Sequence, residues 1–352
     1  MTAFDDLVTW QESSTSGAAI VAALRAGGRS LAAARSLLGP AERIVITGAG
    51  SSYYLAQAGA AVGRAALGRD VIAVPLSELI LRPEGVVFAA GPRPEPIVVI
   101  SRSGSTSEAV AVVHRMRAAG HPTVAVTCRA DSPLAGLADV TLVSPAGDER
   151  AVVMTRSFAS MLALLLNVVA AISGDGDLAA DLRRLGDHWN ESTAAAALGR
   201  RLGTTDWRRI VILGGGPSMG IALEWALKLT ETSQVATSAY EPLEFRHGPI
   251  SVCEPGVLVV GLVGGPGTAD EVAVVEEAGR LGAATWLIVR DPDDARGTTG
   301  DVSLIGGGLQ PVARLPLLLH PGHALALSLA LTRGLDPDAP RHLGQVVIVD
   351  VE

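Results

Sequence analysis

Short apolar segments alternate with longer segments of helical periodicity through most of the chain. Strands are predicted in the first half at residues 43–47, 70–74, 97–100, 122–127 and 140–143. Helices are predicted at residues 54–67, 108–119 and 161–172, and residues 2–38 carry helical periodicity and no strand. This alternation is typical of a doubly wound parallel sheet flanked by helices.

The same order of elements begins again in the second half. A strand at residues 209–213, a glycine turn and a helix to residue 232 repeat the pattern that starts at residue 43. Strands at residues 257–263 and 284–289 repeat the strands at residues 97–100 and 122–127. An internal duplication of one α/β unit explains these similarities. We therefore predict an N-terminal helical segment at 1–38, a first domain at 39–190 and a second domain at 191–352.

A hydroxyl-rich turn follows the apolar strand at residues 97–100. Five of the seven residues from Ser101 to Ser107 carry hydroxyl groups, and a helical pattern starts at Glu108. Backbone N–H groups at a helix N-terminus, joined by short hydroxyl donors such as Ser101, Ser103 and Thr106, suit a single phosphate monoester. Helix capping alone would need only one or two hydroxyls, so a phosphate site is the favoured interpretation.

A second polar turn, Gly48-Ala-Gly50-Ser51-Ser52, follows the first strand. It lacks the third glycine of a dinucleotide-binding fingerprint, and the next strand does not end in an acidic residue, so it is a weak signal for such a cofactor. In an open parallel sheet, ligands bind at the carboxyl ends of the strands. We therefore predict that Ser51 and Ser52 contact the same anion, with helix capping as the alternative.

Charged residues share one face of an otherwise apolar helix in the second half. Glu224, Lys228 and Glu231 are spaced by four and three residues. An exposed ion pair is the simplest alternative, but the apolar neighbours leave little of this helix for solvent, and buried charges need a partner or a function. The loop that follows contains His247 before Gly-Pro. A carboxylate and an imidazole are the groups needed to move protons around a sugar carbonyl.

Composition excludes several other functions. The 352 residues carry a net charge of −8 with a pI near 5.4, which argues against nucleic acid as a partner. Two cysteines far apart fit a reducing cytoplasm, and the acidic N-terminus does not resemble a secretory signal. The apolar segment 161–172 is too short to span a bilayer. His320 and His323 lack a nearby third ligand, and the Pro-Gly between them is expected to prevent helical pairing, so we expect no metal.

Three segments together resemble the sugar isomerase (SIS) family: residues 101–108, the Glu224, Lys228 and Glu231 pattern, and residues 244–249. The resemblance runs from about residue 43 to the C-terminus. It is strongest to the isomerase domain of glucosamine-6-phosphate synthase, to stand-alone aminosugar-phosphate deaminase/isomerases and to fructosamine-6-phosphate deglycases. It implies two tandem SIS domains with flavodoxin-like sheets.

The resemblance also implies roles for individual residues. Glu231 would move the proton between C1 and C2 of the sugar, with Glu224 and Lys228 near the carbonyl end. His247 would assist ring opening, within its own chain or across a homodimer with shared active sites. No cofactor is expected. The residues implied to hold the sugar phosphate are Ser51, Ser52, Ser101, Arg102, Ser103 and Thr106.

Two departures from the synthase pattern narrow the reaction. No glutaminase domain is expected, and Gln345 stands where the synthase has a lysine that condenses with the ketose; an amide cannot form that Schiff base. We therefore expect a cytoplasmic isomerase, deaminase or deglycase that acts on an aminosugar- or fructosamine-6-phosphate through an enediol or enolamine. The alternatives are a non-catalytic sugar-phosphate-binding regulator and an ammonia-dependent synthase. Other acidic and histidine positions, at residues 271–277 and at His114, His121, His188 and His342, are predicted to be on the surface.

Overall fold

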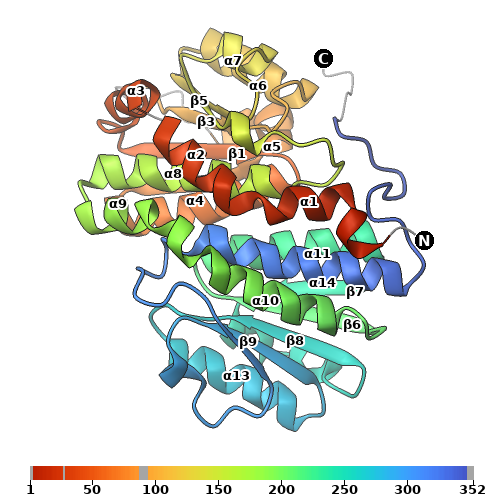
Figure 1. Cartoon of the computed structure of the whole chain (residues 1–352). Helices are drawn as coiled ribbons and strands as arrows, with labels where there is room; N and C mark the ends of the chain where they lie inside the picture. The colour runs from red at the N-terminus through yellow and green to blue at the C-terminus, as the bar shows by residue number, and fades with distance from the viewer. Residues whose placement is uncertain (1–2, 27, 87–93, 347–352) are drawn as a thin grey trace. The chain divides into compact units, whose positions relative to one another are not determined.

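The computed structural model describes residues 3–26, 28–86 and 94–346, and the chain divides into two compact units. The first-sheet unit consists of the described parts of Thr15–Arg150, Arg156–Gly186 and Gly344–Glu352. The second-sheet unit consists of the described parts of Met1–Ser14, Ala151–Thr155 and Asp187–Leu343. Each contains one five-stranded parallel sheet with helices packed on it (Figure 1). This architecture confirms the predicted fold class, while the predicted domain limits at residues 38 and 190 stay a prediction.

The first sheet has the strand order β2-β1-β3-β4-β5, which is the flavodoxin-like order. The central strands β1, β3 and β4 consist mostly of buried Val, Ile and Ala, as expected for parallel strands covered on both faces. Because β1 pairs directly with β3, the winding reverses between these two strands, and their carboxyl ends border the crevice where such sheets bind ligands. The strands are β1 (Arg43–Gly48), β2 (Asp70–Pro75), β3 (Ile97–Ile100), β4 (Thr123–Thr127) and β5 (Val140–Val143).

Helices cover both faces of the first sheet (Figure 1). On one face, α4 and α8 pack so closely that a Cβ at Gly59 would stand 2.2 Å from Leu165 Cδ2. The helices packed together on this side are α2 (Ser16–Ala26), α3 (Gly28–Leu38), α4 (Ser51–Leu67), α8 (Arg156–Ser173) and α9 (Gly176–Arg183). On the other face, Val45, Ile97 and Val99 pack with apolar residues of the remaining helices. These are α5 (Leu76–Leu81), α6 (Ser107–Ala118) and α7 (Pro133–Leu137).

The second sheet has the order β10-β9-β8-β6-β7, which is the order of the first sheet read from its other edge. An internal duplication predicts this identity of strand order. Here β6 pairs with β8, so the winding reverses between them, as it does between β1 and β3. The strands are β6 (Arg209–Gly214), β7 (Ala236–Tyr240), β8 (Val257–Leu262), β9 (Ala284–Val289) and β10 (Asp301–Leu304). The sequence pattern did not reveal β7 or β10, which are short and partly exposed.

Helices on one face of the second sheet carry the charged residues of interest. These are α10 (Trp189–Leu202), α11 (Ser218–Ser233) and α14 (Leu319–Thr332), and the opposite face holds α12 (Pro242–Phe245) and α13 (Thr268–Arg280) (Figure 1). The first helix, α1 (Val8–Ser14), also belongs to this unit. The carboxylate of Asp338 accepts hydrogen bonds from the N–H of Val8 at 2.7 Å and from Thr9 Oγ1 at 2.6 Å, which attaches the start of α1 to the C-terminal segment.

Helix α8 is longer than the sequence pattern suggested. Helix α8 extends from Arg156 to Ser173 rather than over residues 161–172, and is therefore long enough to cross a bilayer by length and composition. The segment Leu315–Thr332 passes the same test. Most of each segment, 72% and 89% of the apolar window respectively, is buried inside the protein, as in the core helix of a globular domain.

Candidate active site

The hydroxyl-rich turn joins β3 to α6 in the first-sheet unit. Ser101, Arg102 and Ser103 are buried, and Ser101 Oγ lies 3.4 Å from Thr106 Oγ1. Gly104 has a φ of 61°, and a Cβ at this position would stand 2.1 Å from Ser132 Oγ, so the turn requires glycine here. Its N–H donates to Ser101 Oγ at 3.2 Å. The turn is thus a compact set of short donors before the first residue of α6.

Ser51 and Ser52 occupy the corresponding place after β1. They are the first residues of α4, which begins three residues before the predicted start at residue 54. Both are buried, and Gly50 before them has a φ of 54°. Because β1 and β3 are neighbours in the sheet, the structure brings the ends of both strands, and hence both turns, to the same crevice.

Arg102 makes contacts inside the first-sheet unit. Its Nη1 lies 3.5 Å from the buried carboxylate of Glu149, and its Nη2 donates to the backbone oxygen of Gln345 at 2.8 Å. Glu149 also accepts a hydrogen bond from Ser157 Oγ at 2.6 Å. The side chain of Gln345 donates to the backbone oxygen of Glu149 at 2.7 Å. Arg102 therefore connects the turn to the segment around Gln345. Its predicted contact with a phosphate stays a prediction.

The predicted acid–base residues lie together on α11 of the second-sheet unit. The Lys228 ammonium forms ion pairs with the Glu231 carboxylate and, at 3.5 Å, with Glu224 Oε1. Burial alone would lower the pKa of Lys228, but the two carboxylates outweigh it, so its pKa is raised above the ordinary value. Lys228 is therefore a fixed positive charge rather than a free amine. Glu224 is fully buried, whereas 18% of the Glu231 side chain is exposed.

His247 lies on a different element of the same unit. It follows α12, its backbone N–H donates to the oxygen of Glu244 at 3.0 Å, and its side chain is exposed. Gly248, with a φ of 124°, ends this turn. Within the described residues, no hydrogen bond or ion pair joins the His247 side chain to the charged residues of α11. Its predicted role in ring opening stays a prediction.

A buried histidine pair is a feature that the sequence analysis missed. His320 and His323 both lie on α14, whose first turn accommodates Pro321, so the expectation that Pro-Gly prevents helical pairing was wrong. Ser13 Oγ lies 2.7 Å from Nδ1 of His320 and 2.8 Å from Nδ1 of His323. A hydroxyl donates only one hydrogen, so at least one of the two imidazoles donates its Nδ1–H to Ser13.

The environment of this pair keeps both imidazoles neutral. His320 stacks on Trp10 with ring centroids 4.7 Å apart, and burial lowers its pKa to about 3. Burial, helped by the charge of Lys228, holds the pKa of His323 well below its usual value. Among the described residues, no group of three or more His, Cys, Asp or Glu could hold a metal ion.

Two further surface predictions were wrong. His121 is buried, with Nδ1 at 2.9 Å from the backbone oxygen of Glu95. Glu271, at the start of α13, is partly buried against a cavity rather than solvated. A single sequence gives little signal for either, because both side chains are placed by residues distant in the chain.

Comparison with known proteins identifies the fold family. The model of the SIS domain matches residues 37–171 and 204–305. The chain belongs to the SIS-domain family. The two matched segments contain both polar turns, the charged residues of α11 and His247, and they confirm the resemblance drawn from the motifs.

Relatives in the family include two kinds of named protein. A glutamine–fructose-6-phosphate aminotransferase of Aeropyrum pernix is 30% identical over 91% of this chain and 53% of its own length. A Streptomyces coelicolor protein, provisionally named D-galactosamine-6-phosphate deaminase, is 32% identical over 86% of this chain and 82% of its own. The chain spans about half the length of the aminotransferases it matches.

Solved structures share the whole architecture. Tagatose-6-phosphate ketose/aldose isomerase of Escherichia coli superposes with a TM-score of 0.85 at 25% identity, covering 100% of this chain and 98% of the other. The C-terminal domain of the Francisella tularensis glucosamine–fructose-6-phosphate aminotransferase gives 0.85 at 19% identity, covering 96% and 100%. The second of these likenesses supports the fold alone.

Proposed function

We propose that this chain is a phosphosugar isomerase or deaminase that acts on an aminosugar- or fructosamine-6-phosphate. The observation that carries the proposal is the charged set on α11, where a partly exposed Glu231 carboxylate is held by the buried Lys228 ammonium. A carboxylate held at one place beside a buried charge is typical of a functional site. Sugar isomerisation needs one base at a fixed place. Relatives named for aminosugar-phosphate deamination and for ketose/aldose isomerisation support the same class.

The sugar phosphate is bound by the hydroxyls of the two polar turns. Ser51, Ser52, Ser101, Ser103 and Thr106 donate to its oxygens, and the N-termini of α4 and α6 add backbone N–H groups and helix dipoles. These contacts are the same in the ground state and the transition state. They orient the substrate and contribute binding that does not itself accelerate the proton transfer.

Glu231 carries out the proton transfer. Its carboxylate removes the proton from the carbon next to the carbonyl or imine, which gives an enediol or enolamine, and returns the proton to the adjacent carbon. Lys228 keeps the carboxylate in place, and Glu224 balances the charge of Lys228. His247 exchanges protons with the ring oxygen and the C1 hydroxyl during ring opening. The step is redox-neutral, because one carbon is oxidised as its neighbour is reduced, and in a deaminase water then hydrolyses the resulting imine and releases ammonia.

The experiment that tests this function compares wild type, Glu231→Gln and a control, Glu276→Gln, which removes a charge from α13. Each is incubated with glucosamine-, galactosamine-, fructose-, tagatose- and fructosamine-6-phosphate, with ammonia or amine release and ketose formation as readouts. We expect turnover of one member, lost by a factor of about 10²–10⁴ in Glu231→Gln and kept in Glu276→Gln. Thermal-shift binding should persist in both variants. Stabilisation by a phosphosugar with no turnover in any protein would contradict the enzyme and support a regulator.

A further inference from the structure

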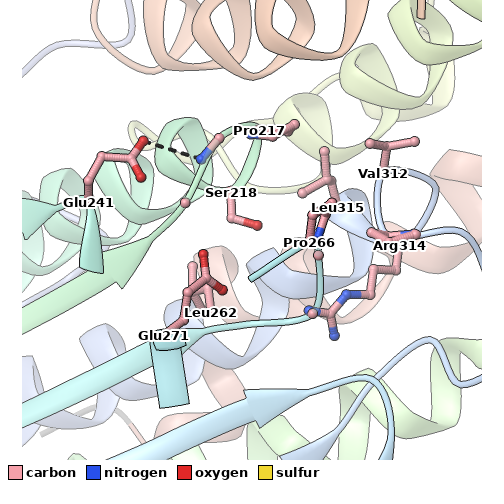
Figure 2. Close-up of a pocket in the computed structure, with 14 residues that line it drawn as sticks. Pro217, Ser218, Glu241, Leu262, Pro266, Glu271, Val312, Arg314 and Leu315 are labelled. Atoms are coloured by element: carbon pink, nitrogen blue, oxygen red, sulfur yellow. Dashed lines mark hydrogen bonds between the residues drawn. The ribbon is translucent and has the colours of Figure 1, made fainter. Parts of the chain in front are cut away.

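A cavity of 320 Å³ lies at the carboxyl edge of the second sheet, away from the charged set on α11. It is formed by the turn after β6, the turn after β8, and the segment that leads to α14 (Figure 2). Strands β6 and β8 are the neighbours between which the winding reverses. This is the position at which open α/β sheets bind ligands, and the volume lies at the lower end of the range for small-molecule pockets, about 300–1,000 Å³.

Two carboxylates meet at one side of this cavity. Figure 2 shows Glu241 and Glu271 reaching toward it from different segments. A Cβ at Gly215 would stand 2.2 Å from Glu271 Oε1 and 3.5 Å from Glu241 Oε2, so both carboxylates approach the same bare stretch of backbone. Burial and the negative charge of Glu241 raise the pKa of Glu271 to about 7, and the positive charge of Arg314 opposes this rise only in part. The two groups therefore repel each other while they share the cavity.

The groups that would attract an anion are already engaged. The N–H of Gly216, at the start of the turn into α11, donates to Glu241 Oε1 at 3.2 Å. The guanidinium of Arg314 lines the cavity but donates to the backbone oxygens of Val263 and, at 2.9 Å, of Ile305. The corresponding turns of the first sheet instead carry several hydroxyl side chains. Because its lining holds two carboxylates against one guanidinium, the same place in the second sheet favours a ligand of positive charge.

We propose that this cavity binds a small hydroxylated amine of the size of one hexosamine. The ammonium group lies between Glu241 and Glu271, and the hydroxyls of the ligand contact Ser218 and the backbone of the glycine turns. A cation there removes the repulsion between the two carboxylates. Among the described residues, neither carboxylate already forms an ion pair. The proposal does not depend on the reaction catalysed elsewhere in the chain.

Binding of glucosamine, which carries no phosphate, tests this site by titration calorimetry. The matched probes are glucose and N-acetylglucosamine, which have similar hydroxyls and no positive charge. The variants are Glu271→Gln, Glu241→Gln and the control Glu276→Gln on the same helix, with the double variant Ser101→Ala/Thr106→Val to remove binding at the phosphate turn. Thermal unfolding of each variant checks that it is folded. Two carboxylate variants are used so that one of them still tests the site if the other does not fold.

We expect glucosamine to bind wild type at least about tenfold more tightly than either neutral sugar, since charge-assisted hydrogen bonds are lost with the charge. Either cavity variant should weaken binding by a similar factor, while Glu276→Gln and the turn variant keep it. At pH 7 wild type should also release a proton on binding, seen as a dependence of the heat on the buffer, and Glu271→Gln should not. Equal binding of N-acetylglucosamine, no binding, or binding lost only in the turn variant would overturn the proposal.

Discussion

Lys228 Nζ lies 3.5 Å from Glu224 Oε1, and both side chains are buried on α11. The second carboxylate, Glu231, forms an ion pair with the same ammonium and is itself partly exposed. Removing two opposite charges from water costs free energy that is recovered only while both stay together. The exposed member of the set thus depends on a buried pair for its position, which links stability and function on one helix.

Replacing Lys228 with Met should destabilise the protein by about 3–5 kcal/mol, because it leaves the buried charge of Glu224 uncompensated. Urea unfolding measures this free energy. The double variant Lys228→Met/Glu224→Met should recover most of the loss, since the only carboxylate then left without the ammonium is the partly exposed Glu231. Arg208→Met, which breaks an exposed ion pair with Glu254, is the control and should cost less than about 1 kcal/mol. Equal losses in Lys228→Met and Arg208→Met would contradict the buried pair.

The double variant Ser101→Ala/Thr106→Val should raise KM for the phosphosugar by about tenfold or more and leave kcat nearly unchanged. Each hydroxyl hydrogen bond to a charged oxygen contributes about 1.5–3 kcal/mol, and these contacts do not change along the reaction. Steady-state kinetics with the substrate found in the panel provides the measurement. Ser105→Ala, an exposed hydroxyl of the same turn, should behave as wild type. A fall in kcat at constant KM would show that the turn does more than bind.

His247 should be supplied to the active site by a second copy of the chain. Its exposed position, without a hydrogen bond or ion pair to α11 among the described residues, motivates this expectation. Glu231→Gln and His247→Asn are each expected to be inactive. In a random mixture of the two, half of the dimers are mixed and one of their two sites is intact, so activity should return to about one quarter of wild type.

The control is a mixture of two single variants, Glu231→Gln and Glu224→Gln, whose substitutions lie on the same helix. Mixed dimers of these variants hold one defect in every site and should stay inactive. Subunit exchange is verified by native mass spectrometry with one variant tagged. If exchange occurs and the first mixture stays inactive, His247 acts within its own chain.

The sequence predicted the elements whose pattern is local. The buried strands and the repeated strand–turn–helix order were visible because parallel strands form uninterrupted apolar segments, and the identical order of both sheets agrees with the duplication. The hydroxyl turn and the α11 set were visible because their residues are close together in the sequence. Strand β10 was missed, since its short, partly exposed pattern does not differ from a loop.

Features made by distant residues could not be predicted. Ser13 reaches the two histidines of α14 across about three hundred residues of chain, and Glu241 meets Glu271 only because Gly215 leaves room. The glycines after β6 and β8 gave no indication of the cavity that they line. Burial also changed the expected character of His121 and Glu271, because single residues carry no signal for what covers them.

The histidine pair should make the protein lose stability as the pH falls below about 6.5. His320 has an ordinary pKa in the unfolded chain and a pKa of about 3 when folded, so between these values the unfolded chain binds a proton that the folded chain does not. Stability therefore falls by up to about 1.4 kcal/mol per pH unit for each such histidine. Urea unfolding from pH 7 to pH 4.5 measures the slope. His320→Gln should reduce it by about that amount, whereas the exposed control His114→Gln should keep the slope of wild type. Parallel slopes in all three proteins would show that His320 is protonated in the folded state.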